Sequence, residues 1–221
     1  MNTRDETTDV LVIGGGTAGF GAAVSAARQG LSVTLLEATT KIGGVMAFCP
    51  GMPWGGGYPQ DQIIGGLIQK VTERLAAMNP PAAKKRPCAL ENFGPEIIYD
   101  HDIATLTMFE MLEEAGARVR LGATALEPEM DGDRIARVSC CDRNGVFYVA
   151  PKVVIDCSGD GDISAKAGVQ HIKGRLAEQH AGARHHRALA RAHPAQGRNR
   201  LNLVAQSCQL PCTIAAEAEA C

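Results

Sequence analysis

The sequence predicts an α/β fold built on a parallel sheet, and three observations lead to this prediction. Residues 9–13 are mostly apolar and β-branched, which is typical of a buried strand. A glycine-rich turn at residues 14–19 follows this strand and precedes an Ala-rich helical stretch at residues 20–29. A second apolar strand at residues 32–36 ends on Glu37. Together these segments form a Rossmann-like βαβ unit with the spacing G-x-G-x-x-G.

Each glycine of the turn has its own physical role. Gly14 permits the tight turn out of the strand, and Gly16 lets a pyrophosphate approach the backbone closely. Gly19 allows the helix to pack on the sheet, and the helix N-terminus offers N–H groups to phosphates. Glu37 can accept hydrogen bonds from both ribose hydroxyls and would repel a 2′-phosphate, which disfavours NADP. The unit therefore predicts a dinucleotide site, the alternative being a structural glycine turn without a ligand.

Length, charge and hydropathy narrow the class of protein. The chain has 221 residues, enough for one domain or for one domain with an extension. Its net charge of −2 gives no reason to expect a nucleic acid or an anionic membrane as partner. No apolar run approaches the roughly 18 residues that span a bilayer. Residues 1–8 are polar and lack a signal peptide, so we expect a cytoplasmic protein.

The cysteines and histidines do not form a recognisable metal site. The five cysteines before residue 160 contain no C-x-x-C pair, and we expect buried thiols, including a packed thiol at Cys49. Histidines gather between residues 180 and 193 without acidic or cysteine partners at a supporting interval. The sequence thus predicts no metal ion.

The middle of the chain carries no catalytic motif. Residues 45–58 are rich in Gly, Pro and Met, and we expect a loop that lines an apolar ligand. Residues 62–78 have the periodicity of an amphipathic helix. Residues 79–87 have the composition of a surface linker, whose three basic residues form either a solvated turn or a phosphate-binding patch.

The next segments predict a helix and a small antiparallel β layer. Residues 102–115 are helical in pattern, and a short strand is expected at residues 118–121. Two hairpin signals follow, Asp131-Gly132 and Asn144-Gly145. A buried strand then returns at residues 152–157, so the antiparallel layer interrupts the α/β pattern.

Two separated motifs resemble those of the two-dinucleotide-binding-domain flavoproteins. More narrowly, the chain is similar to the FAD-dependent oxidoreductase family related to fumarate reductase flavoprotein subunits and to the flavin subunit of heterodisulfide reductase. The matching stretches are residues 12–19, Glu37, residues 42–44 and the strand with its polar end at residues 153–162. The resemblance covers about residues 8–172.

The resemblance implies FAD as cofactor and gives several residues a role. The pyrophosphate would lie on the glycine turn and the adenosine ribose on Glu37. Gly43 and Gly44 would approach the pyrophosphate and ribityl chain, and the backbone near Ala125 would contact adenine. Gly159 and Asp160 would close over the cofactor. The implied cofactor-binding residues are Gly14, Gly15, Gly16, Thr17, Ala18, Gly19, Glu37, Ala38, Gly43, Gly44, Ala125, Gly159 and Asp160.

The acids after the last strand have an alternative interpretation as helix N-caps. Asp162 fits an N-cap before residues 163–167, whereas Asp160 fits the cofactor role better.

We therefore expect an FAD-dependent oxidoreductase, or the N-terminal FAD-binding part of one, that transfers hydride or electrons through the flavin. Its small-molecule substrate and its electron donor or acceptor are not identified by the sequence, and no catalytic residue can be named. One alternative is an NAD-dependent dehydrogenase, against which the glycine pair at 43–44 and Gly159-Asp160 argue. The other is a truncated, non-catalytic fragment.

The composition divides the chain into two parts. Residues 1–172 are expected to form the FAD-binding domain, with an inserted loop and helix region at about 45–100. Residues 173–221 are rich in Ala, Arg, His and Gln and lack aliphatic periodicity. We hypothesise that this tail is out of frame or replaces a native C-terminal half, and that it is poorly ordered.

Overall fold

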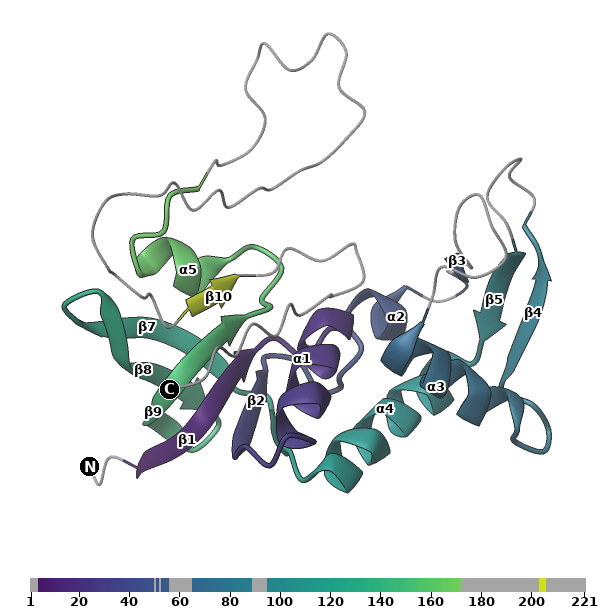
Figure 1. Cartoon of the computed structure of the whole chain (residues 1–221), viewed down its shortest axis with the longest axis horizontal. Helices are drawn as coiled ribbons and strands as arrows, with labels where there is room; N and C mark the ends of the chain where they lie inside the picture. Colours follow the sequence, from purple (N-terminus) through teal and green to yellow (C-terminus); the bar gives the residue numbers. More distant parts are fainter. Residues whose placement is uncertain are drawn as a thin grey trace, which may run out of the picture.

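The structure is a computed structural model that describes residues 4–49, 51, 53–55, 65–88, 95–171 and 203–205. A seven-stranded mixed sheet forms its centre, in the order β6-β2-β1-β9-β8-β7, with β10 beside β9 (Figure 1). Its strands are β1 (Arg4–Ile13), β2 (Val33–Glu37), β6 (Arg118–Leu121), β7 (Thr124–Asp131), β8 (Arg134–Asp142), β9 (Gly145–Asp156) and β10 (Leu203–Ala205).

A second, three-stranded antiparallel sheet lies at the far end of the helices from the main sheet (Figure 1). Its strands, in the order β3-β5-β4, are β3 (Trp54–Gly55), β4 (Ala83–Pro87) and β5 (Pro95–Tyr99). The helices are α1 (Thr17–Ala27), α2 (Val45–Phe48), α3 (Gly66–Ala76), α4 (His101–Ala115) and α5 (Asp162–Lys166).

Strand β1 is an interior strand of the main sheet, and its residues 10–13 are buried on both faces. Val10 and Val12 point into one hydrophobic cluster, whereas Leu11 and Ile13 point into the other. This alternation follows from the two-residue period of a strand. A strand that is covered on both faces has a continuous apolar sequence, and this is why residues 9–13 could be predicted as a strand.

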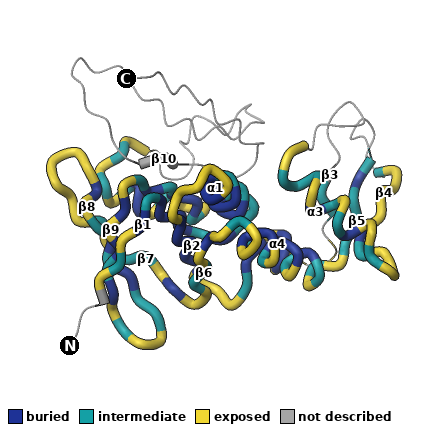
Figure 2. Tube along the Cα trace, turned by 60° about the horizontal axis from the view of Figure 1, so that its bottom comes forward, coloured by how far each residue is buried: buried dark blue, intermediate teal, exposed yellow. Residues whose placement is uncertain are grey.

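Different elements cover the two faces of the sheet. Helices α1, α3 and α4 bury the first cluster, with Phe20 and Met108 fully inaccessible to solvent. The second cluster lies between the sheet and α5, and includes Phe147 and Ile163. Buried segments accordingly concentrate in β1, β2 and α1, whereas exposed ones gather on the hairpins and on β4 (Figure 2). The α/β class predicted from the sequence is confirmed.

Helix α4 begins one residue before the predicted range of 102–115 and ends where predicted. The Asp100 carboxylate caps its N-terminus by accepting a hydrogen bond from the Ile103 backbone N–H at 2.9 Å. At the other end Gly116 adopts a left-handed conformation with φ +83°, which stops the helix.

Both predicted hairpins are present, but their strands do not form a separate layer. Strand β9 is 12 residues long. Its first half pairs antiparallel with β8, and nearly its full length pairs parallel with β1. The antiparallel strands therefore extend the main sheet, because the strand expected at residues 152–157 and the hairpin strand before it are one continuous strand.

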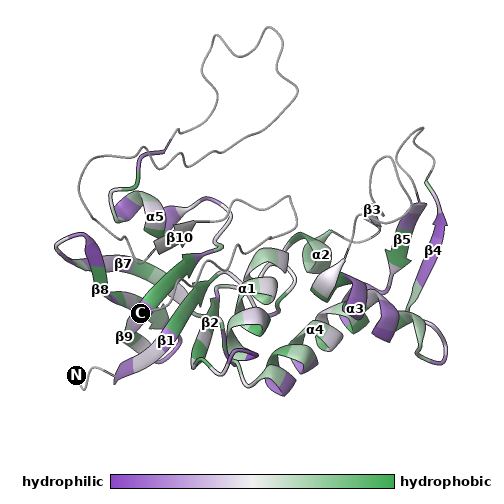
Figure 3. Ribbon diagram, in the orientation of Figure 1, coloured by the Kyte–Doolittle hydropathy of each residue, from purple (hydrophilic) through white to green (hydrophobic). Residues whose placement is uncertain are grey.

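The prediction of a linker at residues 79–87 is wrong, since Ala83–Pro87 form strand β4. Only Ala83 of this strand is buried, and the basic residues after it face solvent. Its partner β5 is apolar where β4 is hydrophilic (Figure 3). An edge strand that exposes charge in this way has no period-two pattern, so composition alone suggests a loop. Likewise, the predicted loop at residues 45–58 includes the short elements α2 and β3.

The region after residue 172 contributes one described element, strand β10. Its three residues pair parallel with Val154, Ile155 and Asp156 of β9. The hypothesis of a poorly ordered, out-of-frame tail did not predict a strand in this region. The remaining residues of this region, and residues 62–64 of the predicted amphipathic helix, lie outside the described part of the chain.

Within the described residues, no helix combines the length and apolarity needed to cross a membrane.

A polar contact ties β1 to the start of β2 and to β9. The Asp9 carboxylate accepts hydrogen bonds from the Ser32 N–H at 2.8 Å and the Ser32 hydroxyl at 2.7 Å. Lys152 Nζ lies 2.6 Å from the other carboxylate oxygen. The Lys152 ammonium, and next the Ser32 donors, hold the pKa of Asp9 well below its usual range.

Because the folded-state pKa of Asp9 is depressed, this carboxylate stabilises the fold above its ordinary pKa and loses that effect as the pH falls below about 4. We expect Asp9→Asn to have a lower free energy of unfolding than the unsubstituted protein at pH 7. The difference between the two proteins should be smaller at pH 3. Urea unfolding at both pH values measures this. Asp133→Asn, at an exposed turn between β7 and β8, is the control. An equal gap at both pH values would contradict the assignment.

Candidate functional site

The glycine turn between β1 and α1 is packed directly against the end of β9. Gly14 has φ +98°, and a Cβ atom at this position would lie 2.3 Å from the Cys157 carbonyl oxygen. The Gly14 N–H donates to the Leu36 carbonyl at 2.8 Å, and the Cys157 N–H donates to the Ile13 carbonyl at 2.7 Å. Both the backbone angle and the close approach therefore require glycine at this position.

The third glycine sets how closely α1 approaches the turn. A Cβ atom on Gly19 would lie 1.8 Å from the Gly14 carbonyl oxygen. Helix α1 is N-capped by Gly16, with no side-chain cap and no acidic residue in its first turn, which includes Thr17 and Ala18. No side chain of the first turn therefore caps the N-terminus of α1, which is the end of a helix that attracts phosphates.

Glu37, the last residue of β2, lies against this turn and is 8% exposed. One carboxylate oxygen accepts from the Gly15 N–H at 2.7 Å, and the other accepts from the Thr39 N–H at 2.7 Å. Each carboxylate oxygen can accept a further hydrogen bond. Glu37 is therefore fixed beside the turn and keeps acceptor capacity for a ribose. Ala38 follows it in an exposed bend.

The glycine pair at 43–44 packs on the same turn. The Gly43 N–H donates to the Gly15 carbonyl at 2.8 Å, and Gly43 forms an isolated parallel bridge with Gly16. Both glycines have positive φ, and a Cβ atom on Gly44 would lie 3.0 Å from the Gly16 Cα. The structure thus brings together two glycine motifs that the sequence separates by about 25 residues.

The second predicted contact, Gly159-Asp160, lies at the same edge of the sheet as the glycine turn. Strands β1 and β9 are parallel neighbours, with Ile13 opposite Asp156, so their carboxyl ends coincide. Gly159 has φ +93°, and both Gly159 and Asp160 are exposed. Open parallel sheets bind ligands at this edge.

The interpretation of Asp162 as a helix N-cap is wrong. Gly161 is the N-cap residue of α5, and Asp162 is the first residue of the helix. The Gly161 and Asp162 N–H groups donate instead to the Ser158 hydroxyl, at 3.1 Å and 3.3 Å. A serine three residues before a glycine cap is only a weak signal in the sequence.

Ala125 lies on β7, half-buried against the second hydrophobic cluster and opposite Cys140. The chain just before β7 is tied to the end of β2, since the Ala123 N–H donates to the Glu37 carbonyl at 3.0 Å. Ala125 is thus two residues from a contact with the predicted ribose acid, and its contact with adenine stays a prediction.

The segment after Gly44 meets an aromatic group that the sequence interpretation did not identify. Trp54 and Tyr99 stack with ring centroids 3.9 Å apart, and the Tyr99 hydroxyl donates to the Met46 carbonyl at 3.4 Å. His101 Nε2 accepts from the Gly51 N–H at 3.0 Å. Burial raises the pKa of Tyr99. These rings come from segments about 45 residues apart, so no local pattern links them.

The thiol of Cys49, at the end of α2, is exposed, so the prediction of a packed thiol at this position is wrong. In contrast, Cys140 and Cys157 are buried, and burial raises the pKa of Cys140 to about 12. Among the described residues, no three His, Cys, Asp or Glu side chains come together as metal ligands.

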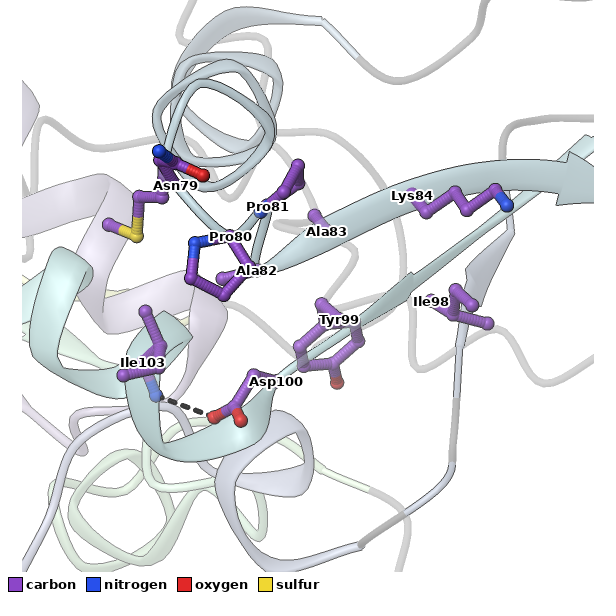
Figure 4. Close-up of a pocket in the computed structure, with 11 residues that line it drawn as sticks. Asn79, Pro80, Pro81, Ala82, Ala83, Lys84, Ile98, Tyr99, Asp100 and Ile103 are labelled. Carbon is purple, nitrogen blue, oxygen red and sulfur yellow. Dashed lines mark hydrogen bonds between the residues drawn. The ribbon is translucent and has the colours of Figure 1, made fainter.

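A pocket of about 790 Å³ lies apart from the glycine turn, between the loop after α3 and the start of α4 (Figure 4). Its lining is largely apolar, and Lys84 and Asp100 are the charged residues among those that line it. None of its lining residues belongs to the glycine turn, to β1 or to β9. The candidate site is therefore defined by glycines and backbone donors at a sheet edge, and this pocket is not part of it.

The glycine turn, the acid that ends β2 and the coincident end of β9 define a dinucleotide-binding protein of the Rossmann type. The family model of FAD dependent oxidoreductases matches residues 9–217, and the chain belongs to this family. FAD is thus the cofactor that the family membership assigns, as the resemblance implied. The match extends well beyond residue 172, into the region that the composition set apart.

Comparisons with individual proteins agree with this membership. The chain is 32% identical over 179 residues to a digeranylgeranylglycerophospholipid reductase of Picrophilus torridus, covering 74% of this chain and 42% of that protein. A 4-oxocyclohex-2-ene-1-carboxylate 5-dehydrogenase of Sinomonas cyclohexanicum is 39% identical over 72 residues, which is 33% of this chain and 12% of that protein. The chain therefore spans less than half the length of these relatives.

Solved structures share the fold at low identity. A geranylgeranyl bacteriochlorophyll reductase-like protein of Thermoplasma acidophilum superposes with a TM-score of 0.53 at 22% identity, over 75% of this chain and 43% of that one. THI4 of Thermovibrio ammonificans gives a TM-score of 0.53 at 20% identity, over 75% and 64%.

We expect Gly19→Ala to lower the free energy of unfolding by about 1–3 kcal/mol or more, because its methyl group would overlap the Gly14 carbonyl. Gly21→Ala is the matched control in the same helix, where no atom lies within 4 Å of the added Cβ. This control should be neutral or stabilising by up to about 1 kcal/mol. Urea unfolding of the two variants measures the difference. Equal effects would show that α1 does not pack as described.

Proposed function

We propose that the chain is an FAD-dependent oxidoreductase, or the FAD-binding part of one, in which the glycine turn, Glu37, Gly43-Gly44 and Gly159-Asp160 hold the cofactor. One observation carries the proposal. Three segments far apart in the sequence meet at one edge of the sheet: residues 14–19 and 158–160 follow the neighbouring ends of β1 and β9, and residues 43–44 contact the glycine turn. A ligand long enough to touch all three is a dinucleotide.

The residues present fit such a ligand in chemistry as well as in position. The N-terminus of α1, which has no side-chain cap, suits a pyrophosphate, and the fixed Glu37 carboxylate suits a pair of ribose hydroxyls. Bound FAD would supply the chemistry, the reversible acceptance of two electrons with a proton. The protein's own groups bind and orient it.

The segment that follows the glycine pair, of which residues 45–49, 51, 53 and 54 are described, is the part of the chain that we assign to the flavin ring and to the substrate side. Its support is the continuity of the chain from Gly44 and the stacked pair Trp54–Tyr99 that follows. The substrate is a small molecule, and an electron donor or acceptor completes the reaction. A cytoplasmic location remains part of this proposal.

The decisive experiment is titration of the purified chain with FAD and, separately, with NAD. We expect FAD to bind with a visible flavin spectrum and quenched fluorescence, and NAD to bind far more weakly. Binding of NAD without FAD would support the alternative of a dehydrogenase, and binding of neither would support a non-catalytic fragment.

Glu37→Gln tests the proposed ribose contact. The substitution removes the negative charge and turns one acceptor into a donor facing the Gly15 or Thr39 N–H. Charged hydrogen bonds contribute about 1.5–3 kcal/mol, so the Kd for FAD should rise about tenfold or more. Glu113→Gln, exposed on α4, is the control and should leave the Kd unchanged. An unchanged Kd in Glu37→Gln would remove this residue from the site.

A further inference from the structure

We propose that Asp156 is a positioning residue for the cofactor, which it serves by holding the loop at residues 158–161 in a shape that can receive FAD. The inference rests on the proposed function. Asp156 is the last residue of β9, and its side chain is 1% exposed, so it cannot itself reach a ligand at the surface.

Among the described residues, the Asp156 carboxylate accepts three hydrogen bonds, and all of them come from the chain that follows it. One oxygen accepts from the Ser158 N–H at 3.1 Å. The other accepts from the Ser164 N–H and from the Ser164 hydroxyl, both at 2.8 Å. The carboxylate thereby joins the beginning of the loop to α5 beyond it, and fixes the separation between the two ends of the loop.

Ser158 adds a second set of contacts inside the same loop. Its hydroxyl oxygen accepts hydrogen bonds from the Gly161 N–H at 3.1 Å and the Asp162 N–H at 3.3 Å. Asp156 therefore holds Ser158, and Ser158 holds the far end of the loop. The two residues between these anchors, Gly159 and Asp160, form its exposed tip.

The tip retains hydrogen-bonding groups for a ligand. Within the described part of the chain, the N–H groups of Gly159 and Asp160 have no acceptor, whereas the N–H groups on either side of them are occupied. Gly159 has φ +93°, with no atom within 4 Å of where a Cβ would lie. The N–H groups of Ser158 and Gly161, at the two ends of the loop, are thus occupied, whereas those of Gly159 and Asp160 at its tip are available to a ligand.

A carboxylate suits this position better than an amide of the same size. Burying a charge is costly unless it is hydrogen-bonded, and here three donors from the described part of the chain face the two oxygens. In Asp156→Asn one oxygen becomes an NH₂ group that faces an N–H donor, which breaks at least one contact. The loop would lose an anchor although the side chain keeps its volume.

The test compares Ser158→Ala with Ser139→Ala in the whole chain. Ser139, on β8, also accepts a hydrogen bond from one backbone N–H, that of Glu127 at 3.1 Å, and it donates to the Glu127 carbonyl at 3.2 Å. The two variants therefore lose a similar pair of contacts at different places. Fluorescence titration gives the Kd for FAD, and thermal unfolding without FAD gives the stability of each variant.

We expect Ser158→Ala and Asp156→Asn to raise the Kd for FAD about tenfold or more, whereas Ser139→Ala changes it less than twofold. The two serine variants should unfold at similar temperatures. Equal Kd values for the two serine variants would overturn the inference, even if Asp156→Asn fails to fold. If the unsubstituted chain binds FAD, such a result leaves the proposed function standing, and if it does not, the proposed function itself fails.

Discussion

The parallel pairing of β1 with β9 is the constraint on which the rest of the site depends. The two strands run side by side from Arg4 opposite Phe147 to Ile13 opposite Asp156. Parallel strands end at the same edge, so the glycine turn and the loop after β9 leave the sheet together. The approach is so close that Gly14 has no room for a side chain beside the Cys157 carbonyl. A slip in this register would separate the two segments that face the proposed ligand.

Two buried carboxylates at strand ends fix the conformation of the loops at this edge of the sheet. Glu37, at the end of β2, accepts N–H groups from Gly15 and Thr39, and Asp156, at the end of β9, accepts from Ser158 and Ser164. In each case the acid orders a loop that local sequence alone leaves free. Hydrogen bonds to charged groups contribute about 1.5–3 kcal/mol each, which is comparable to the cost of about 1–2 kcal/mol for ordering the backbone of each loop residue.

Local patterns predicted the βαβ unit, both hairpins and helix α4, because strand period, glycine spacing and helix ends are encoded within a few residues. The incorrect predictions concern segments whose structure depends on a strand that is distant in the sequence. Strand β4 depends on its pairing with β5, and β9 on having β8 and β1 as partners at once. The same reason applies to the site. Glu37 and the glycines were found by spacing, whereas the contacts of Asp156 and Ser158 depend on a loop conformation.

The contacts at this edge are made by backbone groups, glycines and two acids, and this explains how the fold can be shared at low identity. Backbone N–H donors are independent of side-chain identity, so most positions of the sheet can vary while the edge persists. Solved structures with 16–22% identity accordingly keep the same architecture. The segment after Gly44 differs in kind, because Trp54, Tyr99 and His101 make its contacts through their rings. Changes in those side chains would alter the surface next to the proposed flavin without altering the edge that holds it.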